Sequence, residues 1–297
     1  MKHTIFKGYA TAMVTPMTST GVDYDALTRF IEFQIENGIN ALVAVGTTGE
    51  SATLTPEERS EVIRFTVKRV NGRVPVIAGT GTNNTQHVLE YTRRACSSGA
   101  DAVLVVTPYY NKATQAGLVR HYTTLADAVS CPVILYNVPS RTGVTIAPET
   151  CARLAEHRNI LGIKEASGDL GAVQRIRRLC PPDFYIWSGN DDETVPICAL
   201  GGKGVISVAA NVVPAQMHQL VELCLQNDFA AAGELQVALK PLCDALFCEV
   251  NPIPVKTALN LMGWEAGPLR LPLCQPSEEH LQLLQSTLAE YGLLPES

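Results

Sequence analysis

Two side chains that together suit carbonyl chemistry, a lysine and a tyrosine, end neighbouring apolar runs of this sequence. Lys164 ends the run that begins at Ile160, and Tyr136 ends the run before it. Alternation along an extended strand puts Ile160, Gly162 and Lys164 on one face, with Gly162 leaving space below the lysine. A lysine that loses its hydration favours the neutral amine, which attacks carbonyl groups and forms Schiff bases. A phenol beside it can shuttle the protons that this chemistry requires.

Each of these side chains also has a structural interpretation. Lys164 can form an ion pair with a neighbouring carboxylate such as Glu165, because structural ion pairs are common. Tyr136 can be a core tyrosine whose hydroxyl is satisfied by a hydrogen bond. Their positions at the ends of neighbouring strands, where both would face one cavity, favour the catalytic interpretation.

Further polar residues directly follow other apolar runs. The glycines of the turn 46–49 allow backbone N–H groups to converge on a carboxylate or phosphate. The hydroxyls of Thr47 and Thr48 add donors and a possible proton relay. Arg141 can hold a carboxylate through two hydrogen bonds, and a solvated loop arginine is the alternative. Tyr110, after the fourth run, either lines the same site or packs in an interface.

These residues are positioned by a repeated strand-helix unit. Eight short apolar runs, rich in β-branched residues, begin near Tyr9, Ala41, Val74, Ala102, Val133, Ile160, Phe184 and Gly204. The segments between them carry apolar residues at helical spacing, as at Leu118, Tyr122, Leu125 and Val129. Strands that alternate with helices form parallel sheets, and eight such units predict a closed (β/α)₈ TIM barrel. An open doubly wound sheet is the rival, but no G-x-G-x-x-G follows the first run.

We divide the chain into two regions. Residues 1–226 are predicted to form the catalytic barrel, whose active site lies at the carboxyl ends of the strands. Residues 227–297 carry no strand-like run and are predicted to be a helical extension. Leu281, Leu284 and Leu288 mark one helix of that extension by their spacing.

The composition narrows the function classes. The 297 residues carry 23 Lys and Arg against 29 Asp and Glu, and a net charge of −6 without a basic run disfavours nucleic-acid binding. No apolar stretch is long enough to span a membrane. The histidines form no H-E-x-x-H motif or other visible metal cluster. The nine cysteines include no C-x-x-C pair, which disfavours a disulfide framework and predicts reduced thiols in a cytoplasmic protein.

Three motifs, GTTGES (46–51), YNVPSRTG (136–143) and GIKEASG (162–168), closely resemble the dihydrodipicolinate synthase family of class I, pyruvate-dependent aldolases. The resemblance covers nearly the whole chain, with further matches at VIAGTG (76–81), TPYYN (107–111), GVISV (204–208) and NPIPVK (251–256). It implies a barrel enzyme that condenses pyruvate with L-aspartate-4-semialdehyde to 4-hydroxy-tetrahydrodipicolinate, the first committed step of the diaminopimelate route to lysine.

The resemblance also implies catalytic roles. Lys164 matches the lysine that forms the Schiff base with pyruvate, and Tyr136 matches the proton donor and acceptor. Thr47 and Tyr110 match its partners in a proton relay, with the tyrosine at the Tyr110 position contributed across a dimer interface. Because the imine of the lysine is the electron sink, no metal or organic cofactor is expected.

The substrate contacts and the assembly are implied in the same way. Thr48 matches the residue that holds the pyruvate carboxylate, and Ile206 matches a position whose backbone contacts pyruvate. Arg141 matches the arginine that receives aspartate semialdehyde. The family is usually a homotetramer built from two tight dimers, which we expect here.

Two other functions share parts of this pattern. Sister aldolases that cleave N-acetylneuraminate or keto-deoxy sugar acids share the lysine and the tyrosine. Arg141 favours an amino-acid carboxylate over a sugar polyol, which needs neutral hydrogen-bonding groups. A non-catalytic barrel that binds keto acids would keep the carboxylate-binding turn, but it has no need for both Lys164 and Tyr136.

One departure from the family concerns regulation. Relatives inhibited by lysine typically carry histidines at the positions of Pro56 and Arg59, and a glutamate at that of His87. Asn83 and Tyr109 do match lysine-site positions of those relatives. Because a glutamate pairs with the ammonium of lysine far more readily than a histidine does, we predict weak or absent inhibition by lysine.

Overall fold

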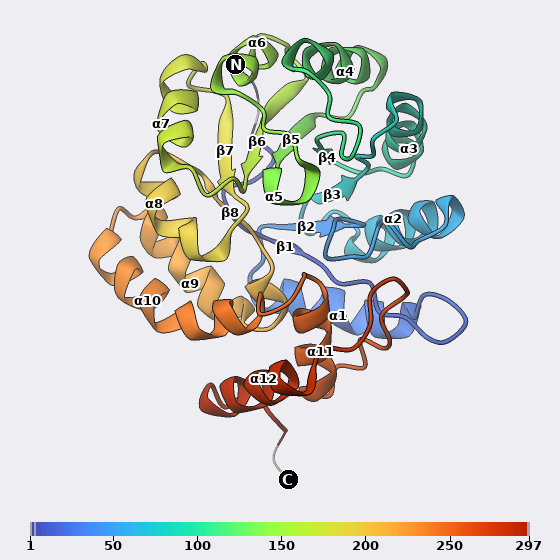
Figure 1. Ribbon diagram of the computed structural model, residues 1–297, viewed down its shortest axis with the longest axis vertical. Coiled ribbons are helices and arrows are strands. Elements are labelled where there is room, and N and C mark those ends of the chain that lie inside the picture. The colour runs from blue at the N-terminus through green and yellow to red at the C-terminus, as the bar shows by residue number, and fades with distance from the viewer. Residues whose placement is uncertain (1, 3, 296–297) are drawn as a thin grey trace.

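Eight parallel strands close into a barrel in the computed structural model, which describes residues 2 and 4–295. The strands follow one another around the barrel in chain order, and β1 pairs with β8 to close it (Figure 1). They are β1 (Gly8–Ala12), β2 (Ala41–Ala44), β3 (Val76–Gly79), β4 (Ala102–Val106), β5 (Val133–Asn137), β6 (Ile160–Glu165), β7 (Tyr185–Ser188) and β8 (Gly204–Ser207). The predicted (β/α)₈ barrel is confirmed.

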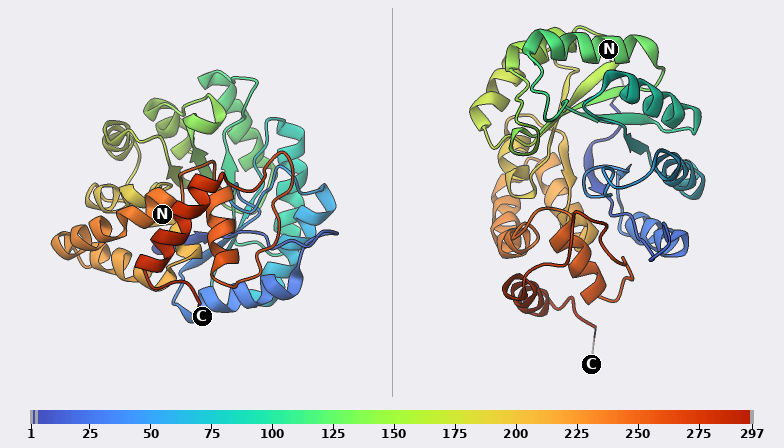
Figure 2. Two further views of the ribbon diagram at one scale, coloured as in Figure 1. Left: turned by 60° about the horizontal axis from the view of Figure 1, so that its bottom comes forward. Right: turned by 45° about the vertical axis from the view of Figure 1, so that its right-hand side comes forward.

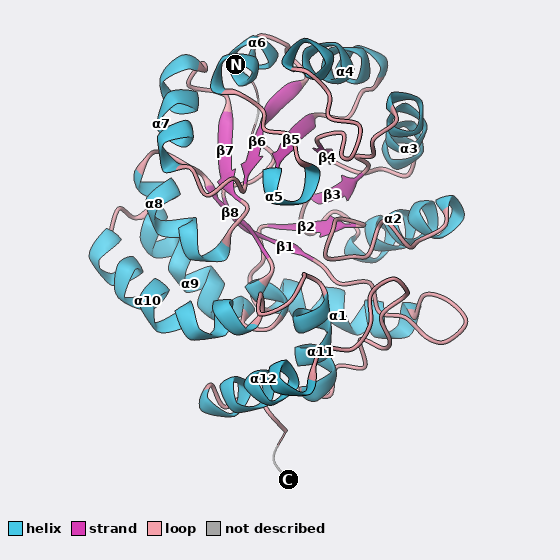
Figure 3. Ribbon diagram, viewed as in Figure 1, coloured by secondary structure: helices cyan, strands magenta, loops and turns pink. Residues whose placement is uncertain are grey.

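Helices form a layer around the strands (Figure 3). They are α1 (Tyr24–Glu36), α2 (Pro56–Val70), α3 (Thr85–Ser97), α4 (Gln115–Ala128), α5 (Pro139–Thr142), α6 (Pro148–Ala155), α7 (Leu170–Leu179), α8 (Thr194–Ala199), α9 (Pro214–Leu225), α10 (Phe229–Ala245), α11 (Ile253–Leu261) and α12 (Glu278–Glu290), with the 3₁₀ turns η1 (Asp191–Glu193) and η2 (Ala209–Asn211). No helix within the described part of the chain is both long and apolar enough for a membrane span.

The C-terminal helices pack on one side of the barrel. Helix α10 contacts α8 and α9, and α12 packs against α10 and α11 (Figure 2). Leu284 and Leu288 of α12 are fully buried, as their helical spacing predicts. The predicted helical extension is therefore present.

Strand residues alternate between two apolar layers. Ile134 and Tyr136 of β5 point into the barrel, whereas Val133 and Leu135 pack between the strand and the outer helices. Lys164 pairs with Tyr136 in the register of β5 and β6. Because residues that lie opposite each other in a sheet share a face, the lysine also points inward.

One strand departs from the predicted alternation. The pairing of β5 with β6 shifts register between Val133 and Ile134. Val133 lies opposite Ile160, while the next residue lies opposite Gly162, so β6 contains one extra residue. Ile160 therefore packs in the outer layer, and the prediction that it shares the inward face of Lys164 is wrong.

Gly162 is required for a different reason from the predicted one. A Cβ atom there would lie 2.1 Å from the carbonyl oxygen of Tyr185, so any side chain would force β7 away from β6. The space for the lysine comes instead from Gly189, just after β7, where a Cβ atom would lie 2.9 Å from Cε of Lys164.

The structure also corrects the expectation that all the cysteines are reduced thiols. Cys96, near the end of α3, forms a disulfide with Cys131, which precedes β5. The two residues are 35 positions apart in the chain, but their Cα atoms lie 5.7 Å apart because the barrel places these segments side by side. A pairing of this kind leaves no local spacing signature such as C-x-x-C.

Candidate active site

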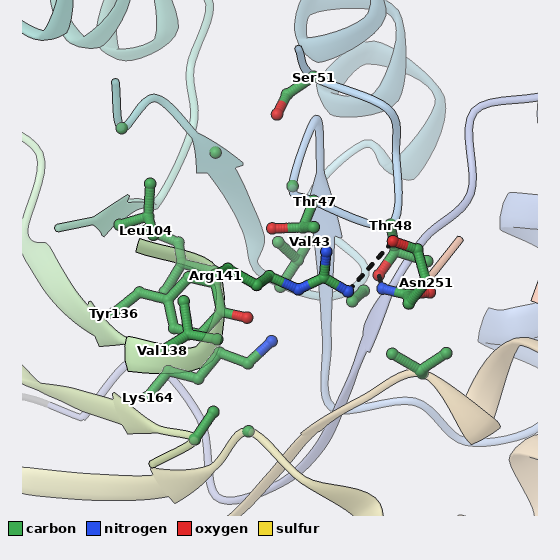
Figure 4. Close-up of a pocket in the computed structure, with 18 of the residues that line it drawn as sticks. Val43, Thr47, Thr48, Ser51, Leu104, Tyr136, Val138, Arg141, Lys164 and Asn251 are labelled. Atoms are coloured by element: carbon green, nitrogen blue, oxygen red, sulfur yellow. Dashed lines mark hydrogen bonds between the residues drawn. The ribbon is translucent and has the colours of Figure 1, made fainter. Parts of the chain in front are cut away.

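A cavity of about 200 Å³ opens at the carboxyl ends of the strands, where barrel enzymes bind their substrates. It is lined by five of the predicted site residues, whose side chains converge in Figure 4: Lys164, Tyr136, Thr47, Thr48 and Arg141. Apolar side chains complete the wall, among them Ala12, Val43, Leu104, Val106 and Val138. A few polar groups converging in apolar surroundings are typical of small-molecule sites.

The amine of Lys164 faces the ring of Tyr136. Nζ lies 4.5 Å from the ring centroid, and the two side chains are 4% and 7% exposed. Figure 4 shows the amine and the tyrosine hydroxyl pointing into the same part of the cavity. The pair is therefore placed for attack on a carbonyl group with proton transfer alongside it.

Glu165 does not form the ion pair that was the alternative interpretation of Lys164. Its carboxylate accepts hydrogen bonds from Nδ2 of Asn137, at 3.1 and 3.0 Å, and from the backbone N–H of Ser167. Burial raises the pKa of the Glu165 carboxyl, and these hydrogen bonds oppose the shift. Within residues 2 and 4–295, no ion pair involves Lys164, so its amine is available to a ligand.

The turn after β2 lines the cavity and contains unpaired backbone donors. It is closed by hydrogen bonds from the N–H of Glu50 to the carbonyl of Thr47 and from the N–H of Ser51 to that of Gly46. The N–H groups of Thr47 and Thr48 make no hydrogen bond to the described residues. Unpaired amides in a tight turn suit a carboxylate, which is the ligand that the sequence predicts for this turn.

Asn251 connects the turn after β2 with Arg141. Its side-chain amide donates to Oγ1 of Thr48 at 3.0 Å, and its backbone carbonyl accepts from Nη2 of Arg141 at 3.1 Å (Figure 4). The residue precedes α11 and is 6% exposed. The sequence shows no chemical signal at this position, because Asn251 lies far beyond the last strand; only the NPIPVK motif points to it.

A buried carboxylate behind the site is a second group that the sequence does not reveal. Asp191, in η1, accepts hydrogen bonds from the backbone N–H groups of Val208 and Ala209, and Val208 lines the cavity. Burial raises the pKa of the Asp191 carboxyl, while these hydrogen bonds, one from Ser207 and the nearby charge of Lys164 oppose the shift. Asp191 therefore holds the segment after β8 against the cavity.

Comparison with known proteins identifies the protein family that contains this site. Residues 5–291 match the Dihydrodipicolinate synthetase family. The 4-hydroxy-tetrahydrodipicolinate synthase of Thermoanaerobacter sp. (strain X514) is 52% identical over 294 residues, which cover 99% of each chain. The chain belongs to this family. Its sequence resemblance to dihydrodipicolinate synthases is thereby confirmed over almost the full length.

Two further relatives agree with the family assignment. The 4-hydroxy-tetrahydrodipicolinate synthase of Acetivibrio thermocellus is 51% identical over 294 residues, which cover 99% of this chain and 100% of that one. The crystal structure of dihydrodipicolinate synthase from Thermotoga maritima is similar with a TM-score of 0.96 at 46% identity. That match covers 98% of this chain and 100% of the other.

Two residues to which the dihydrodipicolinate synthase resemblance assigns roles do not line the cavity. Tyr110 is 89% exposed and lies outside it, in a left-handed backbone conformation with φ of 72°. Ile206 is fully buried inside the barrel, below the cavity wall, which at this strand end is formed by Val208. A single chain thus assembles five of the seven predicted residues at one cavity.

A second cavity of about 290 Å³ adjoins the first and contains a buried cation. Arg59 is 8% exposed and donates to the carbonyl oxygens of Ser51 and Gly79, with its guanidinium 4.4 Å from the ring centroid of Tyr91. Burial lowers the pKa of the Arg59 guanidinium, and arginine nevertheless remains charged in proteins. Tyr109 and Glu50 line the same cavity. Because the carboxylate of Glu50 is paired with Lys256, the charge of Arg59 is not offset there and disfavours a cationic ligand.

Proposed function

We propose that the chain is a cytoplasmic 4-hydroxy-tetrahydrodipicolinate synthase that condenses pyruvate with L-aspartate-4-semialdehyde through a Schiff base on Lys164. The observation that carries the proposal is the buried, unpaired amine of Lys164 at 4.5 Å from the Tyr136 ring, in a cavity that Arg141 also lines. A buried amine next to a phenol suits imine chemistry, and the arginine suits an acidic second substrate.

The first half of the reaction forms a nucleophile from pyruvate. Nζ of Lys164 attacks C2 of pyruvate, and Tyr136 protonates the resulting hydroxyl, which leaves as water to give an iminium ion. Loss of a proton from C3 then gives the enamine. Thr47 and Thr48 line the same cavity, and their N–H groups would hold the pyruvate carboxylate.

The second half forms the carbon–carbon bond and closes the ring. C3 of the enamine attacks the aldehyde carbon, and the aldehyde oxygen takes up a proton. The amine of the semialdehyde then attacks the imine carbon, which displaces the amine of Lys164 and closes a six-membered ring. Because the imine is the electron sink throughout, the proposed reaction uses no metal or organic cofactor.

The proposed assembly is a homotetramer in which Tyr110 enters the site of a neighbouring copy. The high exposure of this tyrosine, outside its own cavity, supports a role across an interface. Sedimentation velocity at micromolar concentration measures the assembly directly, and a monomer that is fully active would contradict this part of the proposal.

One experiment separates the proposed activity from its alternatives. The protein is incubated with pyruvate and borohydride, and its mass is measured; turnover is then assayed with L-aspartate-4-semialdehyde and with N-acetylneuraminate. We expect one pyruvate adduct per chain and turnover of the semialdehyde alone. Turnover of N-acetylneuraminate would support the sister aldolases, and absence of any adduct would support a non-catalytic keto-acid-binding barrel.

Replacing Arg141 by alanine is expected to raise KM for the semialdehyde by about 10- to 100-fold. The carboxylate of the semialdehyde then loses its charge-assisted hydrogen bonds with the guanidinium. Borohydride trapping of pyruvate should change little, since the carboxylate of pyruvate is assigned to the turn at Thr47 and Thr48. Steady-state kinetics with each substrate varied in turn make the measurement. Equal effects on both substrates would contradict the assignment of Arg141 to the second one.

We expect L-lysine at about 1 mM to leave the initial rate unchanged. A site that bound lysine with a free energy of about 5 kcal/mol would be mostly occupied at this concentration. The reason is the uncompensated charge of Arg59, which repels the ammonium of lysine from the adjoining cavity. A lysine-inhibited relative in the same assay is the control. Half-maximal inhibition below that concentration would overturn this prediction.

A further inference from the structure

A buried ion pair connects the C-terminal region with the turn that follows β2. Nζ of Lys256, on α11, lies 2.6 Å from Oε1 of Glu50, and each side chain is 1% exposed. Burial lowers the pKa of the Lys256 amine, and the neighbouring carboxylate opposes the shift. Removing two charges from water costs about as much as their attraction returns, so such a pair is weak evidence for added stability. The contacts of this ion pair indicate a role other than added stability.

Glu50 is held on its other carboxylate oxygen as well. Oε2 accepts a hydrogen bond of 3.0 Å from the backbone N–H of Arg270, in the segment between α11 and α12. The guanidinium of Arg270 in turn forms two hydrogen bonds of 2.6 Å with the carboxylate of Glu58, on α2. Helix α11 and the segment that contains Arg270 thus both hold the carboxylate of Glu50.

The backbone of Glu50 needs this support. Its φ of 54° lies in the left-handed region, which residues other than glycine rarely adopt. Such conformations persist where several contacts with the surrounding structure hold them in place. The N–H of Glu50 closes the turn by donating to the carbonyl of Thr47 at 3.1 Å, so the conformation of Glu50 is coupled to the backbone that carries the free N–H groups of Thr47 and Thr48.

We propose that the Glu50–Lys256 ion pair is a positioning device for the carboxylate-binding turn, so that the C-terminal region determines the affinity for pyruvate. Neither side chain lines the Lys164 cavity, and both act through the turn. The inference rests on the proposed function, because it assigns the pyruvate carboxylate to this turn. A purely structural role, in which the pair only fastens α11 to the barrel, is the alternative that the experiment must exclude.

The experiment compares full-length variants at a temperature where all of them are folded. Lys256→Met leaves the carboxylate of Glu50 buried without its partner, and we expect a melting temperature lower by roughly 5–15 °C. We also expect kcat/KM for pyruvate to fall by about 10- to 100-fold, since small misplacements of a binding group have effects of this size. The KM for the semialdehyde should change less, because Arg141 is held by Asn251 instead.

Two further variants separate positioning from stability. Leu284→Ala removes a fully buried side chain of α12 and should lower the melting temperature without changing the kinetics for pyruvate. The double variant Glu50→Gln with Lys256→Met removes both charges and should recover melting temperature relative to Lys256→Met. Its kcat/KM for pyruvate should stay low, because the turn has lost its anchor.

Hydrogen exchange supplies a measurement that needs no substrate. The amides of Glu50 and Ser51, which close the turn, should exchange about 10-fold faster in Lys256→Met but not in Leu284→Ala. The proposal is overturned if Lys256→Met keeps the parent's kcat/KM for pyruvate and its exchange rates, or if the double variant recovers both together with its melting temperature. Absence of a pyruvate adduct on the parent protein would instead refute the proposed function, and the exchange rates would still decide the role of the ion pair.

Discussion

The Lys164→Ala variant is expected to form no borohydride-stable adduct with pyruvate and to lose at least about 10⁴-fold in kcat, as enzymes that lose their nucleophile do. The amine of Lys164 is the group on the cavity wall that can form the imine, and alanine leaves the cavity without it. Intact-protein mass spectrometry after trapping, followed by peptide mapping, measures the first effect. Steady-state assays with both substrates measure the second.

Two other lysines provide the comparison for this result. Lys240 lies on the surface of α10 in an ion pair with Asp244, so Lys240→Ala should retain adduct formation and turnover. Lys256 is buried, but its ion pair with Glu50 occupies its amine. An adduct mapped to either of these lysines in the parent protein would remove Lys164 from the role proposed for it.

The Tyr136→Phe variant is expected to lower kcat by about 10²- to 10⁴-fold, the range associated with loss of a general acid–base group. Phenylalanine keeps the ring that packs inside the barrel and removes only the hydroxyl that faces the amine of Lys164. Each proton transfer in forming and collapsing the carbinolamine then depends on water. Trapping should still reach one adduct per chain, but more slowly, which a time course of borohydride quenching measures.

A second buried tyrosine offers a matched control. The hydroxyl of Tyr122, on α4, donates to the carbonyl of Val105 at 3.0 Å and lies in the outer layer. Tyr122→Phe makes the same chemical change outside the cavity, and we expect its effect to be confined to stability. If Tyr136→Phe keeps the parent's kcat, the proton transfers must belong to another group.

The barrel and the strand-end residues could be predicted because their signals are local. Each strand is a short apolar run, and the inward-facing residue near its carboxyl end lies at the mouth of a barrel, so the sequence alone predicts that Lys164 and Tyr136 lie together. The alternation failed at Ile160 because a bulge in β6 arises from the pairing with β5, and a single strand's pattern does not encode its partner's register.

The contributions of the C-terminal region could not be predicted in the same way. Asn251 and Lys256 lie on or next to a helix, in a segment whose composition resembles any buried helical stretch. Their importance comes from partners about 200 positions away, Thr48 and Glu50, which only the folded chain brings within hydrogen-bonding distance. The disulfide between Cys96 and Cys131 could not be predicted for the same reason, since the two cysteines are far apart in the sequence and only the folded chain brings them together.

The connection between Glu50 and the C-terminal region has a consequence for the order of events during protein synthesis. Translation delivers the strands first, and the last of them ends at Ser207, well before Lys256 and Arg270. At about 5–20 residues per second, several seconds separate the last strand from the second anchor of Glu50. A nascent barrel can therefore close around Lys164 while the turn at Thr47 and Thr48 is not yet anchored. If that turn holds the carboxylate of pyruvate as we propose, the amine of Lys164 would meet pyruvate productively only after Arg270 has been synthesised.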